Sequence, residues 1–215
     1  MNVGKWSAIL NALPFRIIHH FTIFLAKRAL LWLGLSKAGV IGNSIGGRIA
    51  WNFAAQYPAR VDKLVLVAPD GYASPGFEYG KAPAVPALLG AMRYVLPKSI
   101  LLMNLAPAYA NPAVLSEAML ARYHDMLLLP GVHVAMLSRM QQTVLRDPLP
   151  SLQKIQAPTL LLWGEKDAMI PFANAQDYLR ALPNSRLVSL PNVGHLPQEE
   201  AAAEALAPVI TFLRG

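Results

Sequence analysis

The chain has 215 residues, 54% of them hydrophobic and 14% charged, so it is long enough for one compact domain and too apolar for a disordered protein. Its net charge is +7, but the 19 basic residues are scattered and no nucleic-acid motif accompanies them, which argues against a nucleic-acid partner. The absence of cysteine excludes disulfides, thiolate metal sites and a cysteine nucleophile.

The N-terminal segment, residues 1–35, predicts an amphipathic helix. Apolar residues recur at helical spacing from Ile17 to Leu35, but two histidines together with Lys27 and Arg28 interrupt the run. The run is therefore too polar for a membrane span, and the residues before it hold too weak an apolar core for a signal peptide. We expect a cytoplasmic protein.

Four short apolar runs bounded by turn residues predict buried parallel strands. They are Ala38–Ile41, Leu64–Ala68, Thr159–Trp163 and Arg186–Leu190. A helical pattern with Ile49, Phe53 and Tyr57 on one face follows the first run, and another spans residues 172–182 after the third. This alternation predicts an α/β fold, a mostly parallel sheet with flanking helices, built from residues 36–73 and 147–215.

Residues 74–146 contain no strand pattern and several prolines. A structureless loop of this length is improbable in a compact domain, so the helical spacing of Leu115, Met119, Tyr123 and Met126 predicts an inserted helical subdomain. Its methionines and aromatic residues suit either a plain helical core, which explains most of them, or the wall of an adaptable apolar pocket.

The motif GNSIGG, residues 42–47, stands between the first predicted strand and the helix that follows it. A tight strand-to-helix turn strains the backbone of Ser44 and projects its hydroxyl, and small residues at Gly42 and Gly46 avoid clashes across that turn. The helix N-terminus favours negative charge, and the Ile45 backbone N–H points to where an oxyanion would form. With Asn43 before the serine, the pattern is typical of a nucleophile elbow.

Two later loops carry the other candidate groups. The motif WGEKD, residues 163–167, places Asp167 just past the end of the third strand, where open α/β sheets hold site residues; the alternative is that Asp167 caps the helix near Pro171. The motif NVGH, residues 192–195, follows the fourth strand. The His195 loop could therefore turn back toward Ser44, with Asp167 holding a ring nitrogen.

These three motifs, in the order Ser, Asp, His, resemble α/β-hydrolase enzymes of the esterase, lipase and carbon–carbon bond hydrolase type, with the helical insertion where that family carries a cap or lid. The resemblance implies that Ser44 is the nucleophile, His195 the general base and acid, and Asp167 its orienting partner, with the Ile45 N–H as one oxyanion donor. It implies cleavage of an ester or similar carbonyl compound through an acyl-serine intermediate, with no metal or organic cofactor. The apolar insertion favours a small hydrophobic substrate.

The chain departs from the family before the elbow. Members normally place several strands there, and the loop after the third supplies the second oxyanion donor, often beside a His-Gly pair. None of the five histidines in this chain precedes a glycine. We therefore expect that the N-terminal strands are missing, and that Ala38–Ile41 lies at an edge of the sheet or is covered by the N-terminal helix.

Three functions remain open from the sequence. The first is a serine hydrolase of esters, and the second is another enzyme on the same scaffold, either a carbon–carbon bond hydrolase or an acyltransferase. The third is a non-catalytic binding protein or degenerate fragment, held in solution or at a membrane face by its basic amphipathic N-terminus. The sequence predicts no oligomeric state.

Overall fold

The computed structural model describes residues 15–74, 78–81 and 97–215. Four strands form one sheet in the order β1-β2-β3-β4, and every neighbouring pair is parallel. The strands are β1 (Ala38–Asn43), β2 (Val61–Val67), β3 (Thr159–Gly164) and β4 (Ser185–Leu190). The predicted parallel α/β sheet is confirmed, with each strand on the apolar run that indicated it.

Helices alternate with these strands. They are α2 (Phe15–Trp32), α3 (Ile45–Gln56), α4 (Lys98–Leu105), α5 (Glu117–Leu127), α6 (Val132–Gln142), α7 (Leu149–Leu152), α8 (Asn174–Ala181), α9 (Pro197–Glu200) and α10 (Ala202–Arg214). Short 3₁₀ turns occur at η1 (Pro58–Arg60), η3 (Ala106–Ala108) and η4 (Pro112–Val114). Local chemistry fixes some of the ends, since the Ser116 hydroxyl accepts the Met119 N–H at 3.2 Å and so caps α5.

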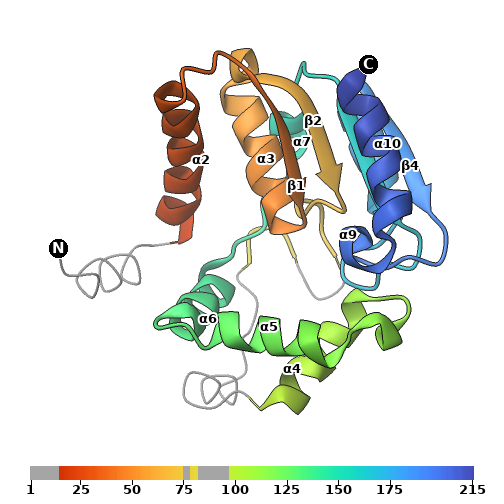
Figure 1. Cartoon of the computed structure of the whole chain (residues 1–215). Helices are drawn as coiled ribbons and strands as arrows, with labels where there is room; N and C mark the ends of the chain where they lie inside the picture. The colour runs from red at the N-terminus through yellow and green to blue at the C-terminus, as the bar shows by residue number, and fades with distance from the viewer. Residues whose placement is uncertain (1–14, 75–77, 82–96) are drawn as a thin grey trace.

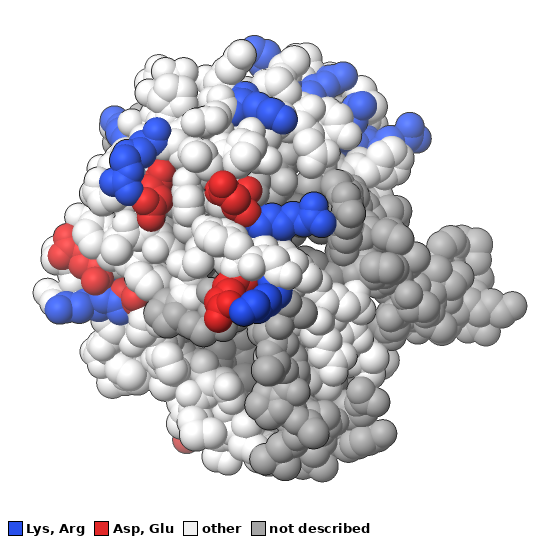
Figure 2. Space-filling model, turned by 180° about the vertical axis from the view of Figure 1, so that it is seen from behind, with Lys and Arg blue, Asp and Glu red and all other residues white. Residues whose placement is uncertain are grey.

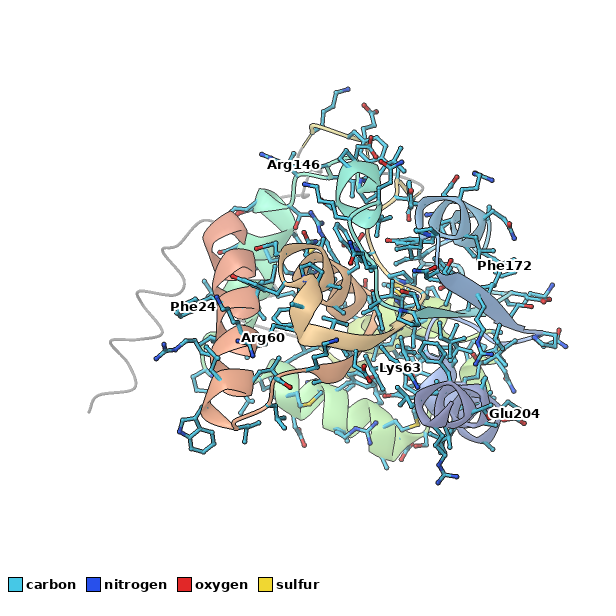
Figure 3. All side chains as sticks on the ribbon, turned by 90° about the horizontal axis from the view of Figure 1, so that it is seen from above. Phe24, Arg60, Lys63, Arg146, Phe172 and Glu204 are labelled. Atoms are coloured by element: carbon cyan, nitrogen blue, oxygen red, sulfur yellow. The ribbon has the colours of Figure 1, made fainter. Side chains whose placement is uncertain are left out.

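Both faces of the interior strands β2 and β3 are buried, which explains why these two strands are the most apolar. On one face Leu64 and Leu66 of β2 belong to the cluster that includes α3, α7 and α8. On the other face Val65 and Val67 pack in the cluster that includes α10. All six residues of β3 are buried. The core is therefore two apolar layers separated by one sheet, with α2 and α10 at opposite sides of the molecule (Figure 3).

The first strand, β1, is an edge strand of the described sheet. Helix α2 lies beside α3 and inserts Ile23, which is 1% exposed, into the core (Figure 1). It does not cover the edge, because Ile41 remains 54% exposed and a groove of about 340 Å³ is open between α2, the start of α3 and β1. Of the two arrangements expected for this strand, the open edge is the one found in the described residues.

The described part of the segment between β2 and β3 contains helices and one isolated bridge between Tyr79 and Leu145. Helices α4, α5 and α6 lie beyond the carboxyl ends of the strands (Figure 1). Helix α5 covers the Leu115–Met126 pattern almost completely, while residues 75–77 and 82–96 of the predicted insertion lie outside the described residues. We call the described residues between β2 and α7 the insertion. It faces the edge of the sheet at which the elbow and the two later loops emerge.

Figure 2 shows how charge is distributed on one face of the molecule. Lysines and arginines are spread over this face, several of them beside acidic residues, and do not form one continuous stripe. No helix within the described ranges is both long and apolar enough to cross a membrane.

We expect Leu161→Ala to lower the free energy of unfolding by about 3 kcal/mol, because Leu161 is fully buried at the centre of β3 and truncation leaves a cavity. Leu206→Ala removes the same atoms from an α10 side chain that is 55% exposed, and should change the free energy by less than about 0.5 kcal/mol. Urea unfolding followed by circular dichroism measures both. Equal effects of the two variants would contradict the assignment of β3 to the core.

Candidate active site

Ser44 occupies the turn between β1 and α3 with φ 53° and ψ −121°. A non-glycine residue with positive φ costs on the order of 1–3 kcal/mol and persists only where neighbouring bonds hold it. Here the Ser44 N–H donates to the Val67 carbonyl at 3.0 Å, and the Ser44 carbonyl accepts the N–H groups of Asp70 at 2.9 Å and Arg48 at 3.0 Å. The turn is thus tied to the end of β2.

The glycines around this turn have different roles. A Cβ at Gly42 would lie 2.3 Å from the Gly46 carbonyl oxygen, and one at Gly47 would lie 2.7 Å from the Pro69 Cβ. The expectation that a small residue is also needed at Gly46 is wrong for the described chain, because a Cβ there meets no described atom within 4 Å. In α3, Gly47 faces Pro69, in the segment that follows β2, whereas Gly46 faces the open groove beside β1.

His195 and Asp167 form a buried pair on adjacent loops. The His195 Nδ1 lies 2.8 Å from Asp167 Oδ2, with the two residues 4% and 8% exposed. The other carboxylate oxygen, Oδ1, accepts the backbone N–H groups of Met169 and Ile170, both at 2.8 Å. Because an ionised carboxylate only accepts hydrogen bonds, we assign the proton to Nδ1, which leaves the His195 Nε2 as a lone-pair base.

The elbow and the histidine loop are joined through Asn43. Its side-chain amide donates to the Val67 carbonyl at 3.1 Å and to the His195 carbonyl at 3.2 Å. Among the described residues, Ser44 Oγ makes no hydrogen bond to His195, and the Ile45 N–H has no backbone acceptor. Of the three predicted residues, the structure therefore brings His195 and Asp167 into contact, while Ser44 is linked to the histidine loop only through its neighbour Asn43. Catalytic hydrogen bonds are often long or absent before substrate binds.

Two acidic residues that the sequence reasoning did not single out connect the histidine loop to the insertion. Glu199 accepts hydrogen bonds from the hydroxyls of Tyr109 at 2.5 Å and Tyr123 at 2.8 Å. Burial, together with the contact to Glu199, raises the pKa of Tyr109 above its ordinary value, so this phenol stays protonated as a donor. Glu200 accepts the backbone N–H groups of Gly194 in the histidine loop and of Ala110 in the insertion. The only sequence signal for these contacts was the pair of adjacent acidic residues, Glu199 and Glu200, shortly after His195.

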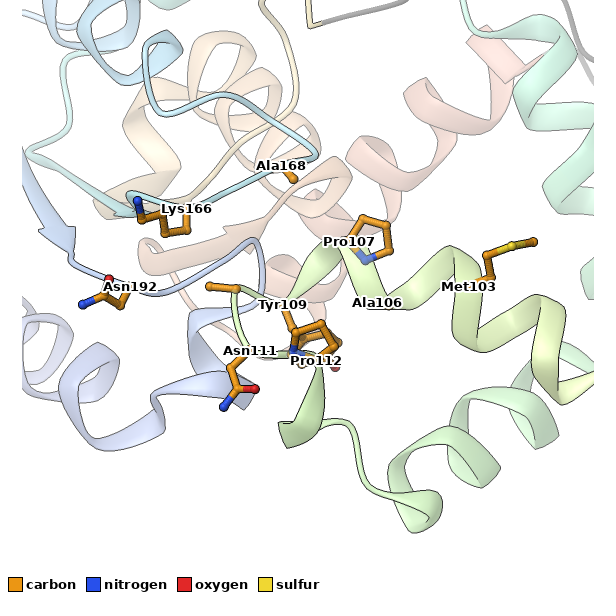
Figure 4. A pocket seen from close by; sticks show the side chains of 10 residues that line it. Met103, Ala106, Pro107, Tyr109, Asn111, Pro112, Lys166, Ala168 and Asn192 are labelled. Carbon is orange, nitrogen blue, oxygen red and sulfur yellow. The ribbon is translucent and has the colours of Figure 1, made fainter.

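A groove of about 680 Å³ opens between the insertion and the acid and histidine loops (Figure 4). Its walls are mainly apolar, and Lys166 and Asn192 add polar groups at the loop side. Neither Ser44 nor His195 lines it, so it lies beside the candidate active site. No group of acidic residues and histidines suited to a metal ion occurs in the part of the chain that the structure describes.

Comparison with known proteins gives one family. The sequence profile of the alpha/beta hydrolase family matches residues 9–209. Among curated proteins, the 2-hydroxy-6-oxo-6-phenylhexa-2,4-dienoate hydrolase of Comamonas testosteroni is 28% identical over 184 residues, 85% of this chain and 64% of the relative. The poly(3-hydroxyalkanoate) depolymerase of Ectopseudomonas oleovorans is 32% identical over 186 residues, again with 64% of the relative covered. The chain thus spans less than two thirds of the length of these relatives.

Solved structures give the same fold. An esterase from Exiguobacterium antarcticum superimposes with a TM-score of 0.73 at 19% identity, covering 92% of this chain and 74% of that one. An alpha/beta hydrolase enzyme from a Medee basin deep-sea metagenome library gives a TM-score of 0.72 at 23% identity, covering 90% and 70%. At these identities the likeness establishes the fold alone.

The glycine geometry makes a paired prediction. Gly42→Ala should lower the free energy of unfolding by about 1–3 kcal/mol or more, because its Cβ meets backbone that cannot rotate away. Gly46→Ala has open space and lies in α3, where alanine is the better helix former, so we expect a change between zero and about 1 kcal/mol of stabilisation. Thermal and urea unfolding of both variants measure the difference, and a Gly46→Ala protein as unstable as Gly42→Ala would contradict it.

Proposed function

The chain belongs to the alpha/beta hydrolase family, and on that premise we propose that it is a serine hydrolase with Ser44, His195 and Asp167 as its catalytic triad. The observation that carries the proposal is the buried 2.8 Å contact between His195 and Asp167 at the edge of the sheet where the strained Ser44 turn emerges. Burial keeps water from competing for the imidazole N–H, so the ring has one defined orientation. The comparisons do not favour a non-catalytic protein.

In the proposed reaction, Nε2 of His195 takes the Ser44 proton while Oγ attacks the substrate carbonyl. Asp167 keeps the proton on Nδ1 and stabilises the imidazolium that forms. The Ile45 N–H, at the first residue of α3, donates to the developing oxyanion, where the partial positive charge of the helix N-terminus adds to it. His195 then protonates the leaving alcohol and activates the water that releases the acyl group.

The proposed substrate is a small, mainly hydrophobic ester or related carbonyl compound. Apolar side chains of the insertion support it, because Met103, Pro107 and Pro112 line the groove that opens next to the acid loop. The relatives include a hydrolase of a phenyl-substituted dienoate and a poly(3-hydroxyalkanoate) depolymerase, whose named substrates also contain carbonyl groups.

A second candidate function is hydrolysis of a carbon–carbon bond in a 2-hydroxy-6-oxo-dienoate. Several of the relatives carry that substrate in their names, among them a Pseudomonas putida hydrolase that is 32% identical over 201 residues. The same nucleophile, base and orienting carboxylate serve both reactions, so the triad does not distinguish them. Substrate assays do.

Labelling with a fluorophosphonate probe tests the triad. We expect Ser44→Ala to abolish labelling, since it removes the attacked oxygen, and Asp167→Asn to lower kcat for a short aryl ester by about 10⁴-fold, since it leaves His195 in the wrong tautomer. Ser151→Ala, a serine on α7 at the opposite end of β3, is the matched control and should label like the wild type. Labelling that persists in Ser44→Ala would overturn the assignment of the nucleophile.

The two substrate classes can be ranked on one enzyme preparation. We expect kcat/KM for 4-nitrophenyl butyrate to exceed that for 2-hydroxy-6-oxo-6-phenylhexa-2,4-dienoate, with both activities lost in Ser44→Ala. Chromogenic assays follow each substrate directly. A dienoate rate about 100-fold above the ester rate would replace the ester proposal with the second candidate.

A further inference from the structure

The carboxylate of Glu200 bridges the histidine loop and the insertion. Its Oε2 accepts the Gly194 N–H at 2.6 Å and the Ala110 N–H at 3.2 Å, and its Oε1 accepts the Asn111 N–H at 2.7 Å. Gly194 directly precedes His195, so one of these bonds fixes the position of the histidine loop. The other two belong to residues of the insertion about 90 positions earlier in the chain.

The two segments approach each other so closely that no side chain fits between them. A Cβ at Gly194 would lie 2.6 Å from the Ala108 carbonyl oxygen and 2.7 Å from the Ala110 nitrogen. The same Ala108 carbonyl accepts the His195 N–H at 2.7 Å. The backbone of His195 is therefore attached to the insertion directly, as well as through Glu200.

This contact defines where the His195 ring sits. Asp167 holds Nδ1, which sets the rotation of the ring, but the distance from Nε2 to Ser44 also depends on where the Gly194–His195 peptide lies. A carboxylate is the one side-chain group that accepts three N–H groups without presenting a donor to any of them, and charge-assisted bonds of this kind are stronger than neutral ones. Misplacing a catalytic group by about 1 Å can cost on the order of 100-fold in rate.

We propose that Glu200 is a positioning residue for His195, which holds the Gly194–His195 peptide and couples it to residues 108–111 of the insertion. The position of His195 relative to Ser44 then depends on where residues 108–111 lie. The kinetic part of this inference rests on the proposed function, whereas the positional part concerns only His195 and is measurable without activity.

The positional test is NMR of the full chain. We expect the ring ¹⁵N shifts of His195 and its Nδ1-bound proton resonance, assigned by difference with His195→Gln, to move or broaden in Glu200→Gln and Glu200→Ala. Glutamine keeps the shape but turns an NH₂ group toward one N–H, so its effect should be smaller than that of alanine. Glu204→Gln makes the same charge change at an exposed side chain four residues later, in the first turn of α10 (Figure 3), and should leave the signals unchanged.

The kinetic test uses the same variants with an aryl ester, with kcat expressed per active site titrated by the fluorophosphonate. We expect kcat to fall about 10-fold in Glu200→Gln and about 100-fold in Glu200→Ala, with KM within about twofold of the wild type. A loss of folded protein alone would lower the titrated sites and leave this kcat unchanged.

The outcomes separate the two proposals. Unchanged His195 signals in both Glu200 variants, with circular dichroism like the wild type, would overturn the positioning role. Shifted signals in a protein that no fluorophosphonate labels would support the positioning role and reject the serine-hydrolase proposal. Shifted signals with a wild-type kcat per active site would show that the position of His195 does not limit the reaction, and would overturn the coupling to catalysis.

Discussion

The parallel direction of the four strands is the constraint on which the rest of the structure depends. Parallel strands end at the same edge, so chain segments as distant as residues 44, 167 and 195 emerge together. Each strand must be followed by a crossing segment, and the helices that cross bury both faces of the sheet in apolar layers. Polar side chains can therefore gather only in the loops beyond the carboxyl ends of the strands, and the insertion lies at this same edge of the sheet.

Burying the Asp167 carboxylate would be costly if either of its oxygens stayed unpaired. The two carboxylate oxygens have different partners, since Oδ2 meets the imidazole while Oδ1 accepts the N–H groups of Met169 and Ile170. The helix-capping role that the sequence left as an alternative for Asp167 is not found, because α8 begins at Asn174 with no side-chain cap, and Oδ1 instead holds the turn at Met169 and Ile170. The turn fixes the carboxylate and the carboxylate fixes the ring, so the geometry is set before any substrate arrives.

The sequence predicted what depends on local patterns. Apolar runs located all four strands, and the GNSIGG motif located the strained turn at Ser44. It did not predict features set by contacts between distant segments. Glu200 lies in an ordinary acidic helix start, and its partners at Ala110 and Asn111 become visible only once the insertion is folded against the histidine loop. Likewise, Gly46 and Gly47 look equivalent in the sequence. Only the folded structure shows that Pro69 leaves no room for a side chain at Gly47, whereas the space beside Gly46 is open.

The described sheet also separates the groups proposed to react from the groups that hold them. Ser44 and His195 follow the edge strands β1 and β4, where fewer neighbours restrain the backbone. The segments that follow the interior strands supply part of their restraint: the end of β2 holds the Ser44 turn through Val67 and Asp70, and the loop after β3 holds the imidazole through Asp167. Asn43 then links the two edges by donating to both Val67 and His195. Contacts to the ends of the interior strands, and for His195 also to the insertion, therefore set the positions of Ser44 and His195.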